Sequence, residues 1–134
     1  MTKTDMINCD IAVIGGGASG LLAAISAARE AERLNKKLNI RIIEGNPRVG
    51  KKILVTGNGR CNFTNENIKE ENFHGESALA YKIYSEFSNS DTTEFFRSIG
   101  LFPKSDFAGR VYPMSSQATA VLDALRCEAA RLGV

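Results

Sequence analysis

The residues best suited to binding chemistry are three glycines, Gly15, Gly17 and Gly20, in the spacing Gly-x-Gly-x-x-Gly. In this spacing the first glycine permits a tight turn, the second lets the backbone approach a pyrophosphate, and the third lets a helix pack against a strand. The pyrophosphate lies on N–H groups at the helix N-terminus, where the helix dipole favours an anion. Alone the pattern is weak, because glycine turns also occur for structural reasons.

An acidic residue follows the glycines at a position that suits a nucleotide. Glu44 lies 24 residues after Gly20, at the end of the second predicted strand. At the end of a second strand, its carboxylate can accept hydrogen bonds from the ribose hydroxyls of an adenosine. It would repel a 2′-phosphate, which argues against NADP at this site. The alternative is an exposed acid at a strand end.

A glycine-rich segment without any carboxylate extends from Gly45 to Asn65. Its cations Lys51, Lys52 and Arg60 suit phosphate charge, with surface solubility as the alternative for each. One turn in it can bring backbone N–H groups close to a flat ring or a phosphate: Gly57, Asn58, Gly59, Arg60, Cys61 and Asn62. Directly after a nucleotide-binding unit, such a segment is typical of a loop around a ligand rather than of a linker.

No residue of the chain stands out as an acid–base catalyst. Cys61 has no cysteine near it in the sequence, which favours close packing against the ligand over a reactive thiol. His74 lies alone in a polar stretch. Tyr112 and Ser115 flank a proline near a helix start, where turn and capping roles are favoured. We therefore nominate no catalytic residue.

The elements that must position the glycines and Glu44 form a βαβ unit. Residues 8–14 predict a strand with apolar side chains on both faces, as in a central parallel strand covered by helices on each side. A helix over 19–34 and a strand over 38–44 follow. A right-handed connection makes the two strands parallel neighbours. The sequence therefore predicts an α/β, Rossmann-like domain with a parallel βαβ core.

The middle of the chain is predicted from periodicity and turn residues. Residues 53–55 are expected to form a short strand or an extended piece. Residues 76–87 predict a helix with Leu79, Ile83 and Phe87 on its apolar stripe. A short helix follows Ser90, with residues 91–94 as its capping box and Gly100 as its stop.

The last third predicts a hairpin over residues 101–113, with a turn near Ser105 and Asp106. The last helix is expected to begin near Ser115 or Ser116. Gly133 and Val134 are then expected to begin a further strand, so we interpret residues 1–134 as the N-terminal part of a longer protein.

Composition restricts the class of protein. The 134 residues are 43% hydrophobic, enough for one domain with a sizeable core. The net charge of +2 and the lack of basic runs interleaved with aromatics argue against nucleic-acid binding. No apolar run approaches the roughly 18 residues of a membrane span, and the N-terminus lacks the apolar core of a signal peptide. Three scattered cysteines indicate a cytoplasmic protein without a metal site.

Three stretches together resemble the aminoacetone-oxidase-like family of NAD(P)/FAD-dependent oxidoreductases, which includes proteins assigned as reductases of a bile-acid pathway. They are Asp10–Gly20, Gly50–Asn65 and Gly109–Ala118. The similarity covers essentially the whole chain, and the second stretch is the most discriminating. One departure is Asn58, where some family members have glycine; asparagine tolerates a positive φ better than most residues.

The resemblance implies the N-terminal part of the FAD-binding domain of a flavin-dependent oxidoreductase. The flavin would carry hydride or electron transfer to or from a small-molecule substrate, with NAD(P)H as a candidate reductant. It implies FAD pyrophosphate at Gly15, Gly17, Ala18, Ser19 and Gly20, ribose at Glu44, and further FAD contacts from Lys51, Lys52 and residues 57–62. In the family a substrate domain and a C-terminal return to the flavin follow, and these are expected beyond residue 134.

Two other functions remain open at this point. One is a flavin- or dinucleotide-binding module without turnover, which senses redox state or supports RNA modification. The other is an NAD-dependent dehydrogenase, which fits the glycines but leaves the segment Gly50–Asn65 unexplained. The substrate, the direction of reaction and the oligomeric state do not follow from the sequence.

Overall fold

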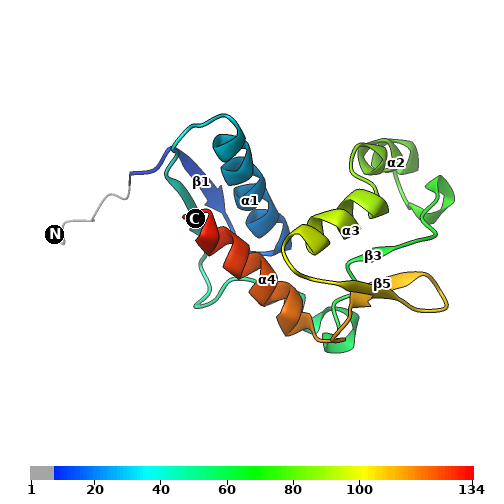
Figure 1. Cartoon of the computed structure of the whole chain (residues 1–134). Helices are drawn as coiled ribbons and strands as arrows, with labels where there is room; N and C mark the ends of the chain where they lie inside the picture. The colour runs from blue at the N-terminus through cyan, green and yellow to red at the C-terminus, as the bar shows by residue number, and fades with distance from the viewer. Residues whose placement is uncertain (1–7) are drawn as a thin grey trace. The chain divides into compact units, whose positions relative to one another are not determined.

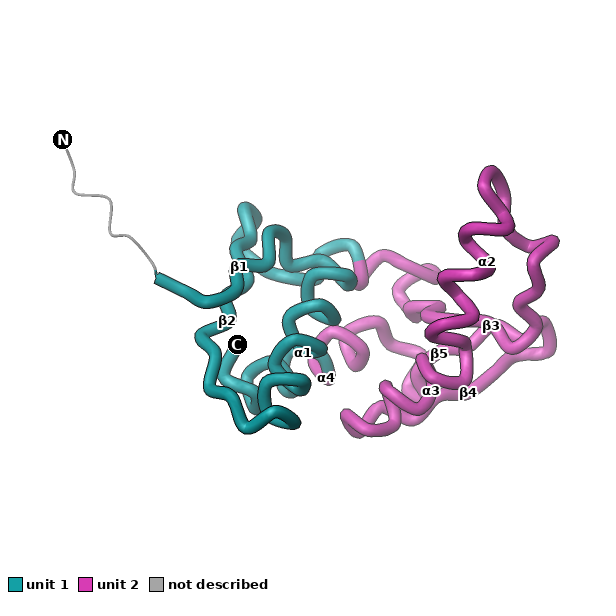
Figure 2. Tube along the Cα trace, turned by 90° about the horizontal axis from the view of Figure 1, so that it is seen from above, with its two compact units in different colours: residues 1–52, 125–134 teal, residues 53–124 magenta. Residues whose placement is uncertain are grey.

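The computed structural model describes residues 8–134 (Figure 1). The chain forms two compact units, which Figure 2 shows in different colours. The first unit comprises residues 1–52 and 125–134, and the second comprises residues 53–124. Among the described helices, none combines the length and the apolar character needed to cross a bilayer.

The first unit contains the βαβ arrangement that the sequence predicts. It consists of β1 (Ile11–Ile14), α1 (Ala18–Arg33) and β2 (Ile40–Ile43). The two strands are parallel, and their register places Ile11 opposite Ile40. The predicted α/β fold with a parallel core is therefore confirmed.

The core of the first unit lies between α1 and one face of the two strands. Ala24 and Ala28 of α1 and Ile40 of β2 form its buried centre, and Val13 of β1 packs against them. The small alanine side chains let α1 approach the strands closely. This packing holds α1 against the strands, with its N-terminus near the end of β1. Leu132, just after α4 (Ala118–Arg131), packs against the same cluster.

The opposite face of the strands differs from the prediction. Ile14 is 78% exposed and Ile43 is 50% exposed. The expectation that helices cover β1 on both sides is therefore wrong for residues 8–134. The physical reason is that the side chains on this face alternate with those that contact α1, and so point away from it.

Charged pairs join α1 to the C-terminal half of α4 within the first unit. Glu128 is 8% exposed and accepts hydrogen bonds from Arg29 Nε and from Arg131 Nε, each at 2.7 Å. Arg131 also lies 3.4 Å from Glu32 of α1. The hydrogen bond from Arg131, followed by that from Arg29, lowers the pKa of Glu128 to about 2.

The second unit is built on a small antiparallel sheet with helices. Its strands lie in the order β3-β5-β4. Its elements are η1 (Ile53–Gly59), β3 (Thr64–Asn65), η2 (Glu70–Asn72), α2 (Ser77–Glu86), α3 (Asn89–Ser98), β4 (Pro103–Ser105) and β5 (Arg110–Pro113). The predicted hairpin is confirmed, because β4 and β5 pair antiparallel across the turn that follows Ser105.

Residues 53–55 form the start of a 3₁₀ helix, so the expected strand or extended piece is wrong. The Thr56 hydroxyl donates to the carbonyl of Ile53 at 2.7 Å, which closes the first turn locally. Gly57 and Asn58 then have positive φ values of 54° and 55°. These left-handed residues turn the chain back before it can extend.

The capping box of α3 lies three residues earlier than predicted. The Ser88 hydroxyl accepts the Asp91 N–H, and the Asp91 carboxylate accepts the Ser88 N–H at 2.7 Å. The box is therefore Ser88 with Asp91, and not residues 91–94. The last helix also begins later than expected, at Ala118, because Ser116 has a positive φ of 56° that a right-handed helix cannot contain.

The apolar stripe predicted for α2 does not face the core. Its members Leu79, Ile83 and Phe87 are all exposed. Instead Tyr81 and Tyr84 hold the helix through ring contacts with Phe73, at centroid distances of 6.1 and 5.9 Å. Helical spacing thus identified an apolar face, while aromatic contacts decided which face packs inward.

Candidate dinucleotide-binding site

The glycine turn joins the end of β1 to the start of α1. Gly15 has a φ of 95°, a conformation that side chains other than glycine rarely adopt. Its N–H donates to the carbonyl of Ile43 at 2.8 Å, which continues the ladder between the strands. The tight turn that the first glycine was expected to permit is therefore present.

Gly20 allows a very close approach between α1 and the turn. A Cβ on Gly20 would lie 1.9 Å from the carbonyl oxygen of Gly15 and 3.5 Å from a methyl of Val13. The first is a clash with backbone, which a side-chain rotation cannot relieve. The third glycine thus lets α1 pack mainly against the turn itself, and only secondarily against β1.

Gly17 is the N-cap of α1 and leaves this end of the helix open. A Cβ on Gly17 would meet nothing within 4 Å, and no side chain caps the helix. The first turn of α1 holds no acidic residue, and Ala18 and Ser19 are exposed. Free N–H groups and the positive end of the helix dipole therefore face a space that an anion can enter.

Glu44 lies one residue after β2 and contacts the glycine turn. Its Oε2 accepts the N–H of Gly16 at 2.7 Å. Its Oε1 accepts the backbone N–H and the side-chain Nδ2 of Asn46, at 2.8 and 2.6 Å. The N–H of Asn46, followed by that of Gly16, holds the pKa of Glu44 below its usual value, so the carboxylate is charged at neutral pH.

The segment after β2 binds both backbone polar groups of Gly16, its N–H and its carbonyl. Its carbonyl accepts the N–H of Gly50 at 2.7 Å, while its N–H is bound by Glu44. A Cβ on Gly16 would lie 2.5 Å from a methyl of Val49. The spacing of three glycines alone did not identify Gly16, Asn46, Val49 or Gly50. The middle glycine of the run Gly15–Gly17, and an asparagine two residues after the acid, are the signals that point to this contact.

The two predicted lysines lie in the first unit, shortly after Gly50. Lys51 and Lys52 are both exposed. The segment that carries them is attached to the glycine turn through the Gly50–Gly16 hydrogen bond. The first unit therefore brings together the predicted glycines and Glu44, and it holds the two lysines on the same connected segment.

The other predicted site residues, 57–62, form a tight turn in the second unit. Gly57, Asn58, Gly59 and Cys61 all have positive φ values. A Cβ on Gly57 would lie 2.8 Å from the backbone nitrogen of Asn62, so this position requires glycine. The Cys61 thiol is free and buried, which disfavours a reactive role.

Arg60 is docked on its own turn. Its Nε donates to the carbonyl of Gly57 at 3.2 Å, and its guanidinium lies 4.6 Å from the ring centroid of Tyr112. Tyr112 is buried on β5 and supplies a platform for the cation, a role that sequence reasoning missed. A cation far from an aromatic in sequence gives no signal of this pairing.

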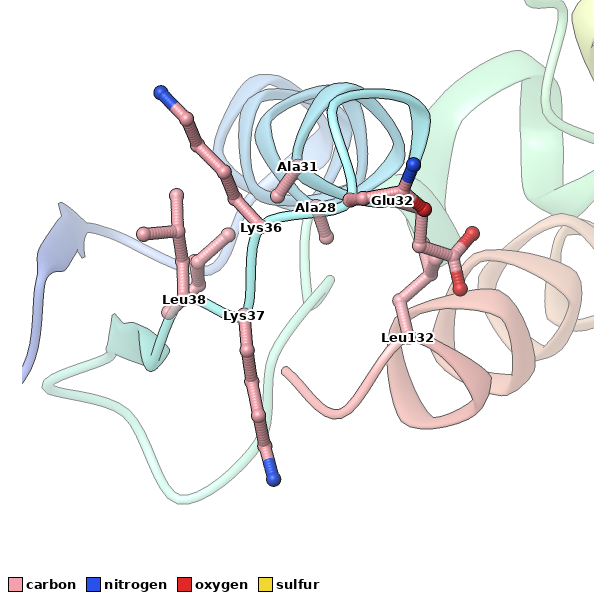
Figure 3. A pocket seen from close by; sticks show the side chains of 9 residues that line it. Ala28, Ala31, Glu32, Lys36, Lys37, Leu38 and Leu132 are labelled. Carbon is pink, nitrogen blue, oxygen red and sulfur yellow. The ribbon is translucent and has the colours of Figure 1, made fainter.

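The first unit has a hollow of about 520 Å³ (Figure 3). It borders the C-terminal end of α1 and includes none of the predicted site residues. The side chains of Lys36 and Lys37 point in opposite directions at its edge. Within residues 8–134, no cluster of three or more His, Cys, Asp or Glu side chains could hold a metal ion.

Residues 9–134 match the family described as the HI0933-like protein Rossmann domain. The chain belongs to this family. The match extends across both units. The family domain therefore includes the turn of residues 57–62 as well as the glycine turn.

Two curated proteins are similar to this chain over part of their length. A 3-dehydro-bile acid delta(4,6)-reductase of Clostridium scindens is 47% identical over 122 residues, covering 90% of this chain and 29% of that protein. A ribosomal RNA dihydrouridine synthase of Escherichia coli is 38% identical over 56 residues, covering 42% of this chain and 12% of that protein. The chain thus spans less than a third of the length of either relative.

Proposed function

We propose that this chain is the nucleotide-binding part of an FAD-dependent oxidoreductase. The observation that carries the proposal is the open N-terminus of α1, where Gly17 leaves space for an anion beside the charged carboxylate of Glu44. An anion site next to a carboxylate fits a molecule that joins a pyrophosphate to a ribose with free hydroxyls. The similarity to a reductase supports redox chemistry.

The residues of the first unit fit the adenosine-diphosphate half of FAD. The pyrophosphate would lie on the N–H groups of Gly15, Gly17, Ala18, Ser19 and Gly20, and the ribose hydroxyls would donate to Glu44. The exposed side chains of Lys51 and Lys52 would offset phosphate charge.

From the resemblance of Gly50–Asn65 to the family motif, we also propose FAD contacts for residues 57–62. Four of these residues have left-handed backbone conformations, and Arg60 supplies a cation that Tyr112 holds in place. FAD, when bound, would supply hydride or electron transfer, while the protein supplies binding and orientation. NAD(P)H is the reductant we propose.

The substrate is proposed only as a small molecule. One relative is named for a bile acid and the other for ribosomal RNA, so their names indicate no common substrate class. We also propose a cytoplasmic location and no membrane partner. The three stretches Asp10–Gly20, Gly50–Asn65 and Gly109–Ala118 support our proposal that the protein belongs to the narrower aminoacetone-oxidase-like group.

The second candidate function is a flavin-binding part of a protein that acts in RNA modification. The similarity to the ribosomal RNA dihydrouridine synthase favours it. The mild net charge of +2 argues against it, because RNA-binding surfaces are usually strongly basic. Binding of an RNA oligonucleotide, measured as a function of salt, separates the two candidates.

The test is whether the purified protein holds FAD. We expect a yellow protein whose absorbance spectrum is that of a flavin, and whose bound flavin is reduced by NADH or NADPH. A colourless protein that binds NAD and not FAD would overturn the proposal. Bound flavin that never turns over with any electron acceptor would instead indicate a redox-sensing module.

A charge reversal at Glu44 tests the site. Glu44→Arg is expected to weaken FAD binding about tenfold or more, because it removes the acceptor for the ribose hydroxyls. Isothermal titration with FAD measures the effect. Glu86→Arg, at an exposed position of α2, serves as the matched charge control and is expected to bind as the unmodified protein does. Equal binding by both variants would remove Glu44 from the site.

A further inference from the structure

The segment after β2 holds the glycine turn through a set of contacts that we call the Gly16 clamp, formed by Glu44, Asn46, Val49 and Gly50. Glu44 binds the N–H of Gly16, Gly50 binds its carbonyl, and Val49 packs on its Cα. The clamp connects two segments that are 28 residues apart at the Glu44 contact. The position of the Glu44 carboxylate is therefore coupled to the position of the turn.

Asn46 decides how the two oxygens of Glu44 are used. Both donors that Asn46 supplies, its N–H and its Nδ2, go to Oε1. A carboxylate oxygen has two lone pairs, so these two bonds fill Oε1. Oε2 accepts the N–H of Gly16 at 2.7 Å, and the Gly45 N–H adds only the weakest interaction with the carboxylate, so Oε2 keeps room for another donor.

The side chain of Asn46 does not behave as turn asparagines usually do. In a typical Asx turn, the side-chain oxygen accepts an N–H further along the chain. Here the amide nitrogen donates to the carboxylate two residues earlier, at 2.6 Å. This contact orients Glu44 in addition to shaping the turn.

We propose that Asn46 is a positioning residue for nucleotide recognition: it holds Oε1 of Glu44 so that Oε2 is presented to a ribose hydroxyl of the ligand. The proposal rests on the function proposed above, in which a nucleotide lies at the glycine turn. Charge-assisted hydrogen bonds depend strongly on geometry, so a carboxylate free to rotate would bind the ribose less well.

The test compares two ligands that differ only in their ribose hydroxyls. ADP and 2′,3′-dideoxy-ADP are titrated into the protein and into Asn46→Ala by calorimetry. We expect Asn46→Ala to weaken ADP about fivefold and to leave the dideoxy analogue within twofold, because its effect passes through Glu44 and the hydroxyls. Asn46→Asp is expected to weaken ADP more, because it places a second carboxylate beside Glu44.

A merely structural role of Asn46 gives a different pattern. If the variant only disturbed the turn, both ligands would weaken by the same factor. That result, or an unchanged affinity for ADP, would overturn the proposal. Gln117→Ala removes an exposed side-chain amide in the second unit and is the control, expected to bind both ligands normally.

A measurement without ligand separates this inference from the proposed function. Hydrogen exchange of the Gly16 amide is expected to quicken about fivefold in Asn46→Ala, because Glu44 then holds that N–H less firmly. Unmodified protein that binds neither ADP nor FAD would contradict the proposed function. Unchanged Gly16 exchange in the variant would contradict the positioning role whatever the ligand results.

Discussion

Replacing Glu128 by glutamine tests whether the buried charge between α1 and α4 stabilises the first unit. Glutamine has nearly the same shape and retains an acceptor oxygen, so the change removes mainly the charge. Glu128 is 8% exposed and bound by Arg29 and Arg131. In Glu128→Gln, Arg29 and Arg131 remain, but the negative charge to which both donate is removed.

The size of the effect follows from the pKa of Glu128. Its lowering from 4.5 to about 2 corresponds to about 3 kcal/mol at the usual conversion for one unit of pKa. Solvent screens part of this, because Arg131 is 54% exposed. We therefore expect Glu128→Gln to lower the free energy of unfolding of the first unit by about 2 kcal/mol near neutral pH.

The effect should depend on pH in a defined direction. A carboxyl whose pKa is lower in the folded than in the unfolded state stabilises the fold above its ordinary pKa of 4.5. The contribution is lost as the pH falls through the folded value of about 2. The difference between the protein and Glu128→Gln should therefore be constant above about pH 5 and shrink steadily towards pH 2.

Hydrogen exchange of the buried α1 amides of Ala24 and Ile25 provides the assay, because it reports on the first unit alone. Glu30→Gln is the control: it removes an exposed carboxylate that pairs with Arg33 within the same helix, and exchange should not change. Equal loss of protection in both variants would show that the Glu128 charge does not stabilise the first unit. An effect of Glu128→Gln that persists undiminished at the lowest pH would show the same.

Two further changes test the candidate site. Gly20→Ala should destabilise the first unit by several kcal/mol, because its Cβ would lie 1.9 Å from the carbonyl oxygen of Gly15. Gly17→Ala should unfold like the unmodified protein and yet bind FAD about tenfold more weakly. Thermal unfolding and FAD titration check the two variants, and equal stability of both would contradict the close packing of Gly20. Tyr112→Leu should raise the rate of tryptic cleavage after Arg60 about threefold, because it removes the ring on which the guanidinium lies. Tyr112→Phe keeps the ring and should leave the cleavage rate unchanged. Equal cleavage rates in the two variants would show that the ring does not hold Arg60.

Much of the fold could be predicted because its signals are local. The βαβ unit follows from apolar periodicity, and the turn at its centre follows from the glycine spacing. The errors arose where a neighbouring group changed a local preference. Thr56 closes a 3₁₀ turn on Ile53, and Ser88 outcompetes later residues as the cap of α3. Aromatic contacts with Phe73 turn the apolar stripe of α2 outward.

The class of fold and the residue types of the candidate site could be predicted from the residues alone: glycines where a backbone must turn or approach closely, and an acid after β2. These follow from steric limits on φ and from strand and helix periodicity, which act within a few residues. Which groups contact one another became visible only in the folded protein. Glu44 binds Gly16, Arg60 lies on Tyr112, and Arg29 pairs with Glu128 across 99 residues. Such contacts depend on how whole elements pack, and no spacing within one element encodes them.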